Sequence, residues 1–211
     1  MSRKIFPIVT LLLSGCFVLS AQANDAALYG PAAPKGSAFV RLYNAGSQDV
    51  DANIGNIHLE TTTPQDSSDF SFLPNGSHSA KIGEQSITVQ LEPEHYYTLV
   101  NLPGKQLTLV EDPPFKGRQK ALLRVQNLSD VSLTLKTADG KTIVVENVAP
   151  QGHGDREINP VKVNLALFDG ERKVVDLPAV ALERGEVTCL FVTGNNNRLV
   201  PVWVKRTHKA D

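Results

Sequence analysis

The stretch FVRLYN at positions 39–44 has apolar residues at the alternate positions Val40 and Leu42, with an arginine between them. Successive side chains of a β-strand point to opposite faces, so this alternation predicts a strand with one buried face. Asn44 ends the stretch with a residue that favours turns. The stretch LLRVQN at positions 122–127 has the same pattern at an offset of 83 residues. The two halves of the chain therefore carry the same kind of strand.

Weaker matches extend this repeat. The motif LPNG at 73–76 resembles APQG at 149–152, and residues 91–99 resemble residues 182–190. Other short stretches alternate in the same way between clusters of Gly, Pro, Asn and Asp, which is typical of strands and turns. They comprise residues 87–91, 132–136 and 161–165, with Asp139-Gly140 and Asp169-Gly170 as hairpin turns. No stretch has a sustained helical period, so we expect an all-β fold.

Residues 111–114 (EDPP) form the clearest break between the halves. Two charged residues followed by two prolines favour an extended, stiff connection over a central strand. We therefore predict two tandem β-sandwich (Ig-like) domains joined by a short Pro-rich linker, over residues 24–112 and 113–211.

The first residues have the organisation of a secretory signal peptide. Two basic residues precede an apolar run over residues 5–19, and the pattern AQA follows, ending at Ala23. This pattern predicts a signal peptide over residues 1–23, cleavage after Ala23 and a periplasmic location. The segment LSGC at 13–16 also resembles a lipobox, in which Cys16 would be acylated and would anchor the protein to a membrane. Both modes of processing stay open.

The charges divide unequally between the two predicted domains. Residues 24–112 hold four basic and eleven acidic side chains, whereas residues 113–211 hold fifteen basic and eleven acidic ones. Halves of opposite charge could orient the protein between two partners, or the charges could simply be solvated. No recognition helix or aromatic RNA-binding motif is present, so nucleic acid is not an expected partner.

A search for catalytic motifs finds none. The chain lacks a G-x-S-x-G nucleophile elbow, an H-E-x-x-H metal motif and a Gly-rich phosphate loop. Ser77 and His78 are adjacent, but neighbours in a strand point in opposite directions. Cys189, the lone cysteine after Ala23, lies in an apolar run and is predicted to be buried. We expect no enzyme activity, cofactor or metal, although a site built from distant residues such as these three remains an alternative.

Aromatic and basic side chains are the remaining candidates for binding. Tyr96 and Tyr97 should point to opposite faces of one strand, and Trp203 should pack within the protein. The candidate contacts with a partner protein or a polysaccharide are Tyr29, Tyr96, Lys116, Arg118, Arg172, Lys173, Lys205 and Arg206.

Several segments identify a family. The segments DAALYGP at 25–31, GSAFVR at 36–41, LKTADGK at 135–141 and NPVKV at 159–163 closely resemble the alginate biosynthesis protein AlgF family. The resemblance implies a periplasmic accessory protein required for the O-acetylation of alginate. It implies an adaptor that links the periplasmic alginate acetylation proteins to one another, to the membrane acetyl-transfer complex and to the export machinery, with no catalytic residues to carry over. The lipobox at Cys16 departs from the soluble pattern of the family. The alternative function is that of a carbohydrate-binding module that holds alginate for acetylation.

Overall fold

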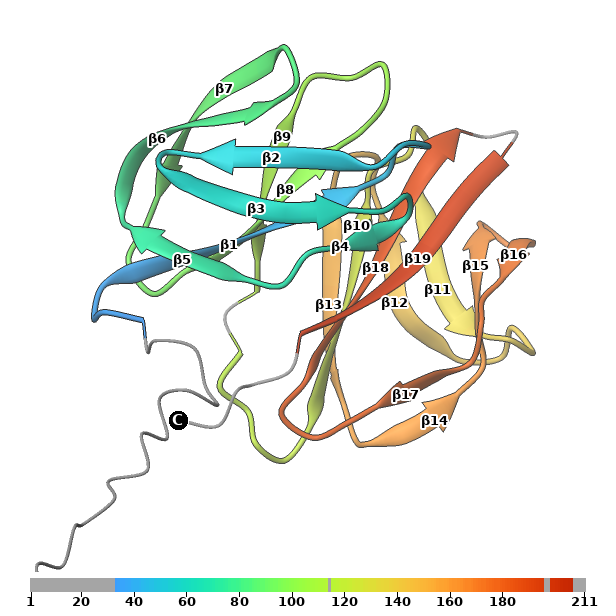
Figure 1. Ribbon diagram of the computed structural model, residues 1–211. Helices are drawn as coiled ribbons and strands as arrows, with labels where there is room; N and C mark the ends of the chain where they lie inside the picture. The colour runs from blue at the N-terminus through green and yellow to red at the C-terminus, as the bar shows by residue number, and fades with distance from the viewer. Residues whose placement is uncertain (1–32, 114, 196–197, 207–211) are drawn as a thin grey trace, which may run out of the picture. The chain divides into compact units, whose positions relative to one another are not determined.

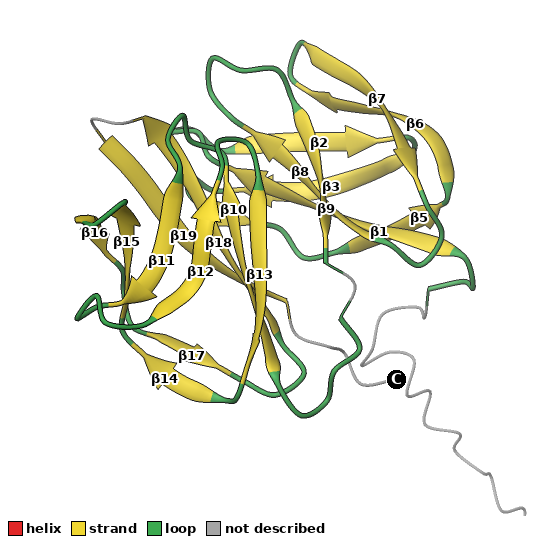
Figure 2. Cartoon of the chain, turned by 180° about the vertical axis from the view of Figure 1, so that it is seen from behind, coloured by secondary structure: helices red, strands yellow, loops and turns green. Residues whose placement is uncertain are grey.

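The computed structural model describes residues 33–113, 115–195 and 198–206, and Arg206 by its backbone alone. These residues form strands, turns and loops, and no helix occurs among them (Figure 2). The predicted all-β fold class is confirmed. The predicted signal peptide, Ala23, Cys16 and Tyr29 lie outside the described residues.

The first half of the chain folds into a β-sandwich (Figure 1). Sheet A has the order β4-β1-β8-β9, with β5 also paired to β1, and sheet B has the order β3-β2-β6-β7. Apolar side chains such as Leu42, Ile54 and Leu99 are fully buried in the core of this half. The strands are β1 (Ser37–Asn44), β2 (Val50–Ile54), β3 (Ile57–Thr62), β4 (Asp66–Ser67), β5 (Ser71–Pro74), β6 (Gly76–Ile82), β7 (Gln85–Leu91), β8 (Tyr96–Asn101) and β9 (Thr108–Asp112).

The second half forms another sandwich with its own core, which includes Leu123, Leu135 and Leu190. Sheet C has the order β13-β10-β18-β19, sheet D has the order β12-β11-β15-β16, and β14 pairs with β17. The strands are β10 (Ala121–Asn127), β11 (Leu133–Thr137), β12 (Ile143–Val148), β13 (His153–Ile158), β14 (Val161–Val163), β15 (Leu165–Asp169), β16 (Arg172–Asp176), β17 (Val180–Leu182), β18 (Val187–Asn195) and β19 (Arg198–Arg206).

The sequence repeat is a structural repeat. Strand β1 runs parallel to β8, and β10 runs parallel to β18 in the matching place. Arg41 lies opposite Thr98 in the first pair, and Arg124 lies opposite Cys189 in the second. The two stretches that alternate in the same way thus occupy equivalent central strands.

Equivalent asparagines close the turns after these central strands. The Asn44 side-chain amide donates to the carbonyl oxygens of Gln48 and Thr62, at 2.7 and 2.9 Å. The Asn127 amide donates to three carbonyl oxygens, including those of Val131 and Val148. Both asparagines are fully buried. Each therefore satisfies backbone groups that would otherwise be left unpaired inside the protein.

A third apolar cluster joins strands of both sandwiches. It contains Tyr43 and Val100 from sheet A together with Leu122, Val187 and Phe191 from sheet C. The rings of Tyr43 and Phe191 stack with their centroids 4.4 Å apart. The outward face of β1 is therefore covered as well as its inward face.

The structure differs from three expectations. Alternation predicted one buried face for the central strands, but Arg41 and Arg124 are also buried, at 1% and 5% exposure. The charged residues of the predicted linker, Glu111 and Asp112, belong to β9, an edge strand of sheet A. The stretch 161–165 was expected to be one strand, but it breaks at Asn164 between β14 and β15, which belong to different sheets. The domain boundary after Asp112 remains a prediction.

Candidate functional site

A buried cluster of polar side chains lies on neighbouring strands of sheet A. Arg41 of β1 places Nη2 3.1 Å from Oδ2 of Asp112 on β9, and both side chains are 2% exposed. The Arg41 Nε–H donates to Oγ1 of Thr98 on β8 at 2.9 Å, and the Thr98 hydroxyl donates to the same Asp112 oxygen at 3.2 Å. A buried charge is stable only when it is paired and hydrogen-bonded, so these three groups stabilise one another.

The equivalent arginine of the second sandwich is also paired. Arg124 Nε and Nη2 donate to the two carboxylate oxygens of Asp155, both at 2.7 Å, and Nη1 donates to the carbonyl oxygen of Glu111 at 2.6 Å. Burial lowers the pKa of Arg124, but the hydrogen bonds and charge of Asp155 outweigh burial and raise it. Because Glu111 precedes the boundary between the halves, this contact joins the second sandwich to β9.

The Cys189 side chain is buried against the first of these clusters. It is 1% exposed, and the Arg41 Nη2 lies 3.9 Å from its Sγ. Burial raises the pKa of the neighbouring Tyr43 hydroxyl above its usual range, and the charge of Asp66 adds to this effect. The prediction of a buried cysteine is confirmed. The Cys189 thiol is therefore shielded from solvent by the described residues.

The other candidate nucleophile and base are not brought together. Ser77 is exposed on β6, while the Nε2 of His78 lies 2.8 Å from the carbonyl oxygen of Pro74. His95 Nδ1 lies 2.9 Å from the Glu111 carboxylate at the surface. In the described part of the chain, no three His, Cys, Asp or Glu side chains gather in a way that could hold a metal ion.

The candidate aromatic residues separate as their positions in the strand predict. The Tyr97 ring is buried, and its hydroxyl accepts a hydrogen bond from the Glu92 backbone N–H at 3.0 Å. Tyr96 is half-buried and stacks on Phe39, with the centroids 4.5 Å apart. The rings of Phe70 and Tyr96 are nearly perpendicular, with their centroids 5.2 Å apart. Tyr96 thus belongs to a group of three rings.

Three of the six candidate basic residues have acidic partners. Arg172 pairs with Asp169 and Lys173 with Asp176, both at 2.9 Å. Lys205 pairs with Glu186 at 3.1 Å and lies 3.8 Å from Glu183.

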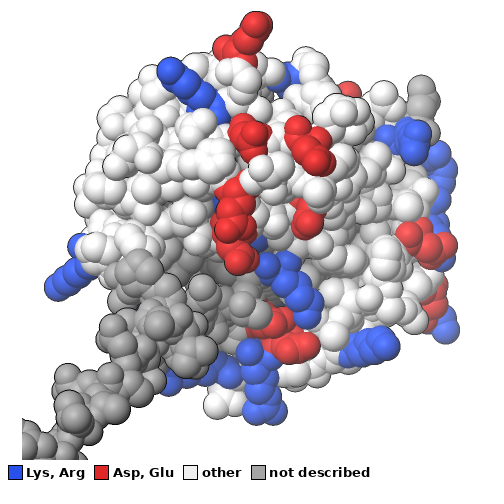
Figure 3. Space-filling model, viewed as in Figure 1, with Lys and Arg blue, Asp and Glu red and all other residues white. Residues whose placement is uncertain are grey.

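The basic candidates come from separate parts of the second half. Lys116 and Arg118 are exposed in the segment before β10, Arg172 and Lys173 lie in sheet D, and Lys205 lies in sheet C. On the face shown in Figure 3, blue side chains are scattered and alternate with red and white ones. The structure therefore does not bring the predicted basic contacts into one continuous patch on this face.

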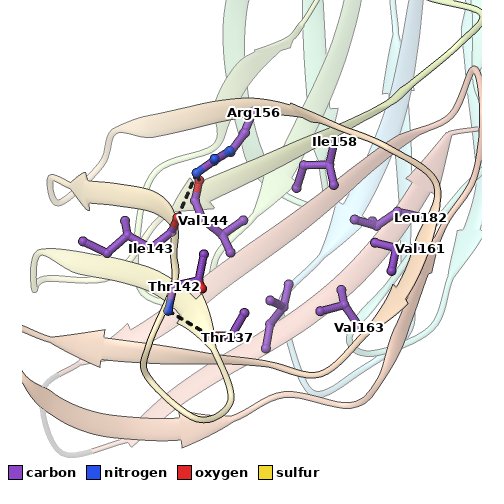
Figure 4. Close-up of a pocket in the computed structure, with 10 residues that line it drawn as sticks. Thr137, Thr142, Ile143, Val144, Arg156, Ile158, Val161, Val163 and Leu182 are labelled. Carbon is purple, nitrogen blue, oxygen red and sulfur yellow. Dashed lines mark hydrogen bonds between the residues drawn. The ribbon is translucent and has the colours of Figure 1, made fainter.

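One feature of the second sandwich was missed by the sequence reasoning. A groove of about 210 Å³ opens between the β11–β12 hairpin, the end of β13 and the small β14–β17 sheet (Figure 4). Seven of its ten lining residues are apolar, two are threonines, and Arg156 is the one charged residue among them. The signal was the valine pair Val161 and Val163, whose break from the next strand at Asn164 was not recognised.

None of the described residues forms a helix of the length and hydropathy needed to cross a membrane.

Comparisons with a family model and with individual proteins point to the same family. Residues 10–189 match the family described as "Alginate O-acetyl transferase AlgF". The chain is 62% identical over 197 residues to the alginate biosynthesis protein AlgF of Pseudomonas aeruginosa, covering 93% of this chain and 91% of that protein. It is 65% identical over 183 residues to the protein of the same name from Azotobacter vinelandii, covering 87% and 84% of the two chains.

Two solved structures are similar to separate parts of the chain. The C-terminal domain of AlgF from P. aeruginosa is 74% identical and covers 42% of this chain and 99% of its own length, with a TM-score of 0.39. The N-terminal domain of the same protein is 52% identical and covers 39% of this chain and all of its own length, with a TM-score of 0.35.

Proposed function

Because the chain belongs to the AlgF family, we propose that it is a non-catalytic periplasmic adaptor for the O-acetylation of alginate. A role in alginate biosynthesis follows from the family itself. The proposed partners are the periplasmic alginate acetylation proteins and the membrane acetyl-transfer complex. The protein holds these partners together so that acetyl groups reach the polymer.

The main support for the proposal is the surroundings of the side chains that could catalyse acyl transfer. Covalent catalysis needs a nucleophile within hydrogen-bond reach of a base, in a place that a substrate can enter. Cys189 is buried against Arg41, and His78 contacts a backbone carbonyl instead of Ser77. The family description names an acetyl transferase. These contacts favour a binding role within that reaction.

Direct binding of alginate is the alternative function, and the surface charges argue against it. Alginate is a polyanion, so its binding would draw on exposed cations. Arg172, Lys173 and Lys205 already contact carboxylates in the folded chain. A polyanion that bound these three side chains would have to displace their carboxylates.

The experiment that tests the proposal combines an activity assay with a binding assay. The purified chain is incubated with an acetyl donor and mannuronate oligomers, and the same preparation is used to recover acetylation proteins from a periplasmic extract. We expect no acetyl transfer by the chain alone and specific recovery of at least two acetylation proteins. Acetyl transfer by the chain alone, or failure to recover any acetylation protein, would overturn the adaptor. Tight binding of oligomers at low ionic strength would favour the alternative.

A further inference from the structure

The apolar groove of the second sandwich is built from three elements. Val144 comes from β12, Ile158 comes from β13, and Val161, Val163 and Leu182 come from the β14–β17 pair. In Figure 4 the side chains of β13, β14 and β17 face Val144 across the opening. These residues form the apolar groove.

Large apolar side chains at the groove are exposed to solvent, which is unusual in this chain. Val161 is 45% exposed and Ile143 is 42% exposed, and these two are the exposed large apolar side chains of the described chain. Both line the apolar groove. Single exposed apolar residues are common on proteins, but their gathering around one opening is typical of a binding site.

The volume of the apolar groove indicates which kind of ligand fits it. Sites for cofactors and drug-sized ligands usually measure about 300–1,000 Å³. The apolar groove, at about 210 Å³, is smaller, and its lining offers few polar groups for a sugar ring. A volume of this kind suits one or two apolar side chains of a polypeptide, which is how central anchor residues bind in protein interfaces.

The charge of Arg156 indicates which kind of residue would lie next to that anchor in the partner. The ion pairs of the described residues do not include Arg156, whereas its neighbours Asp155 and Glu157 pair with Arg124 and Lys120. Arg156 is exposed, and its Nη1 donates to the carbonyl oxygens of Ile143 and Val144, at 2.8 and 3.0 Å. Within the described part of the chain, Nε and Nη2 of Arg156 make no hydrogen bond or ion pair, so a carboxylate fits there.

The same hydrogen bonds decide how a partner would bind. Strand β12 is at the edge of sheet D, so an extended peptide could in principle pair with it. Arg156 covers the carbonyl oxygens of Ile143 and Val144 on this strand. Strand addition is therefore opposed along this part of β12, and insertion of a side chain is favoured.

We propose that the apolar groove is a docking site for a protein partner of the acetylation machinery. The partner inserts a large aliphatic or aromatic side chain between Val161 and Val144, and a nearby Asp or Glu of the same segment pairs with Arg156. This inference rests on the proposed adaptor function and names the surface that performs it.

The test compares groove variants with matched controls in the full chain. Val161→Asp and Arg156→Glu change exposed positions of the groove, and Thr88→Asp and Lys81→Glu make the same changes of charge on the exposed face of sheet B. Affinity for each recovered acetylation protein is measured by titration. Loss of an interface anchor typically weakens binding by about tenfold or more, and we expect this for one partner with both groove variants. Circular dichroism checks that all four variants are folded.

A photo-crosslinking residue at position 161 then identifies what enters the groove. The expected adduct is a peptide of an acetylation protein with an apolar residue close to Asp or Glu. Groove variants that bind the acetylation proteins with unchanged affinity would overturn the inference, while the adaptor function would stand. A crosslinked adduct with a second copy of this chain, or with a basic segment, would have the same consequence. If the unmodified chain recovers no acetylation protein, the adaptor function and this inference fail together.

Discussion

Replacing Asp112 by alanine should destabilise the first sandwich strongly. The change leaves the Arg41 guanidinium 2% exposed without its carboxylate. Removing one partner of a buried ion pair costs about 3–5 kcal/mol. Arg41 keeps the Thr98 hydroxyl and the face of the Phe70 ring, 4.7 Å from its Cζ, so we expect the lower end of that range. A loss of about 3 kcal/mol corresponds to a decrease in Tm of about 6–12 °C for a chain of this size.

The assay is urea unfolding followed by two signals. Far-ultraviolet circular dichroism reports on both sandwiches, while the single tryptophan, Trp203, packs against the core of the second sandwich. The matched control is Glu157→Ala, whose pair with Lys120 is about half-exposed and should change stability by less than about 1 kcal/mol. The double variant Arg41→Met with Asp112→Leu should recover much of the loss, because apolar replacement of a whole buried pair is often neutral. Equal effects of Asp112→Ala and Glu157→Ala would refute the reasoning.

Three further predictions concern single residues. Asn127→Ala should cost about 2–4 kcal/mol in thermal unfolding, because it leaves buried carbonyl oxygens without a donor. Cys189 should resist modification by a maleimide in the folded protein and react quickly in urea, as followed by peptide mass spectrometry, because its side chain is buried. Hydrogen bonds from Thr137 and from the Lys141 backbone N–H lower the pKa of Asp139. These hydrogen bonds therefore stabilise the β11–β12 turn at pH values above the ordinary aspartate pKa. The stabilisation is lost as the pH falls through the lowered pKa of Asp139. Nuclear magnetic resonance titration of the Asp139 carboxyl carbon measures that pKa.

Each of these has a result that would contradict it. An Asn127→Ala variant as stable as the exposed Asn56→Ala control would mean that the turn carbonyls find other donors. Rapid modification of Cys189 in the folded protein would mean that the contact between the sandwiches opens readily. An Asp139 titration midpoint at or above the ordinary aspartate value would mean that the turn hydrogen bonds are absent in solution.

Alternation along the sequence correctly predicted which residues share a face. Val40 and Leu42 are both fully buried in the core, and the equivalent stretch in β10 behaves in the same way. Alternation carries no information about what covers the other face. Arg41 was therefore expected on a solvated surface, but the third apolar cluster covers it. The pairing of Arg41 with Asp112 joins residues 71 positions apart, and only the fold shows it.

The binding surfaces were harder to predict than the fold. Basic residues such as Arg172 and Lys205 were selected because cations attract acidic partners, but each has a carboxylate close to it in the structure. Burial and ion pairing depend on the tertiary fold, so composition alone does not distinguish an unpaired cation from a paired one. Arg156 differs from them through its place at the apolar groove, which forms where three strand edges meet.

The most direct test of the adaptor function is crosslinking with mass spectrometry in cells that make acetylated alginate. The adaptor predicts crosslinks from single molecules of this chain to at least two different acetylation proteins, with no acetyl adduct on Ser77 or Cys189. Crosslinks to none of these proteins, or an acetyl group carried by the chain itself, would contradict it.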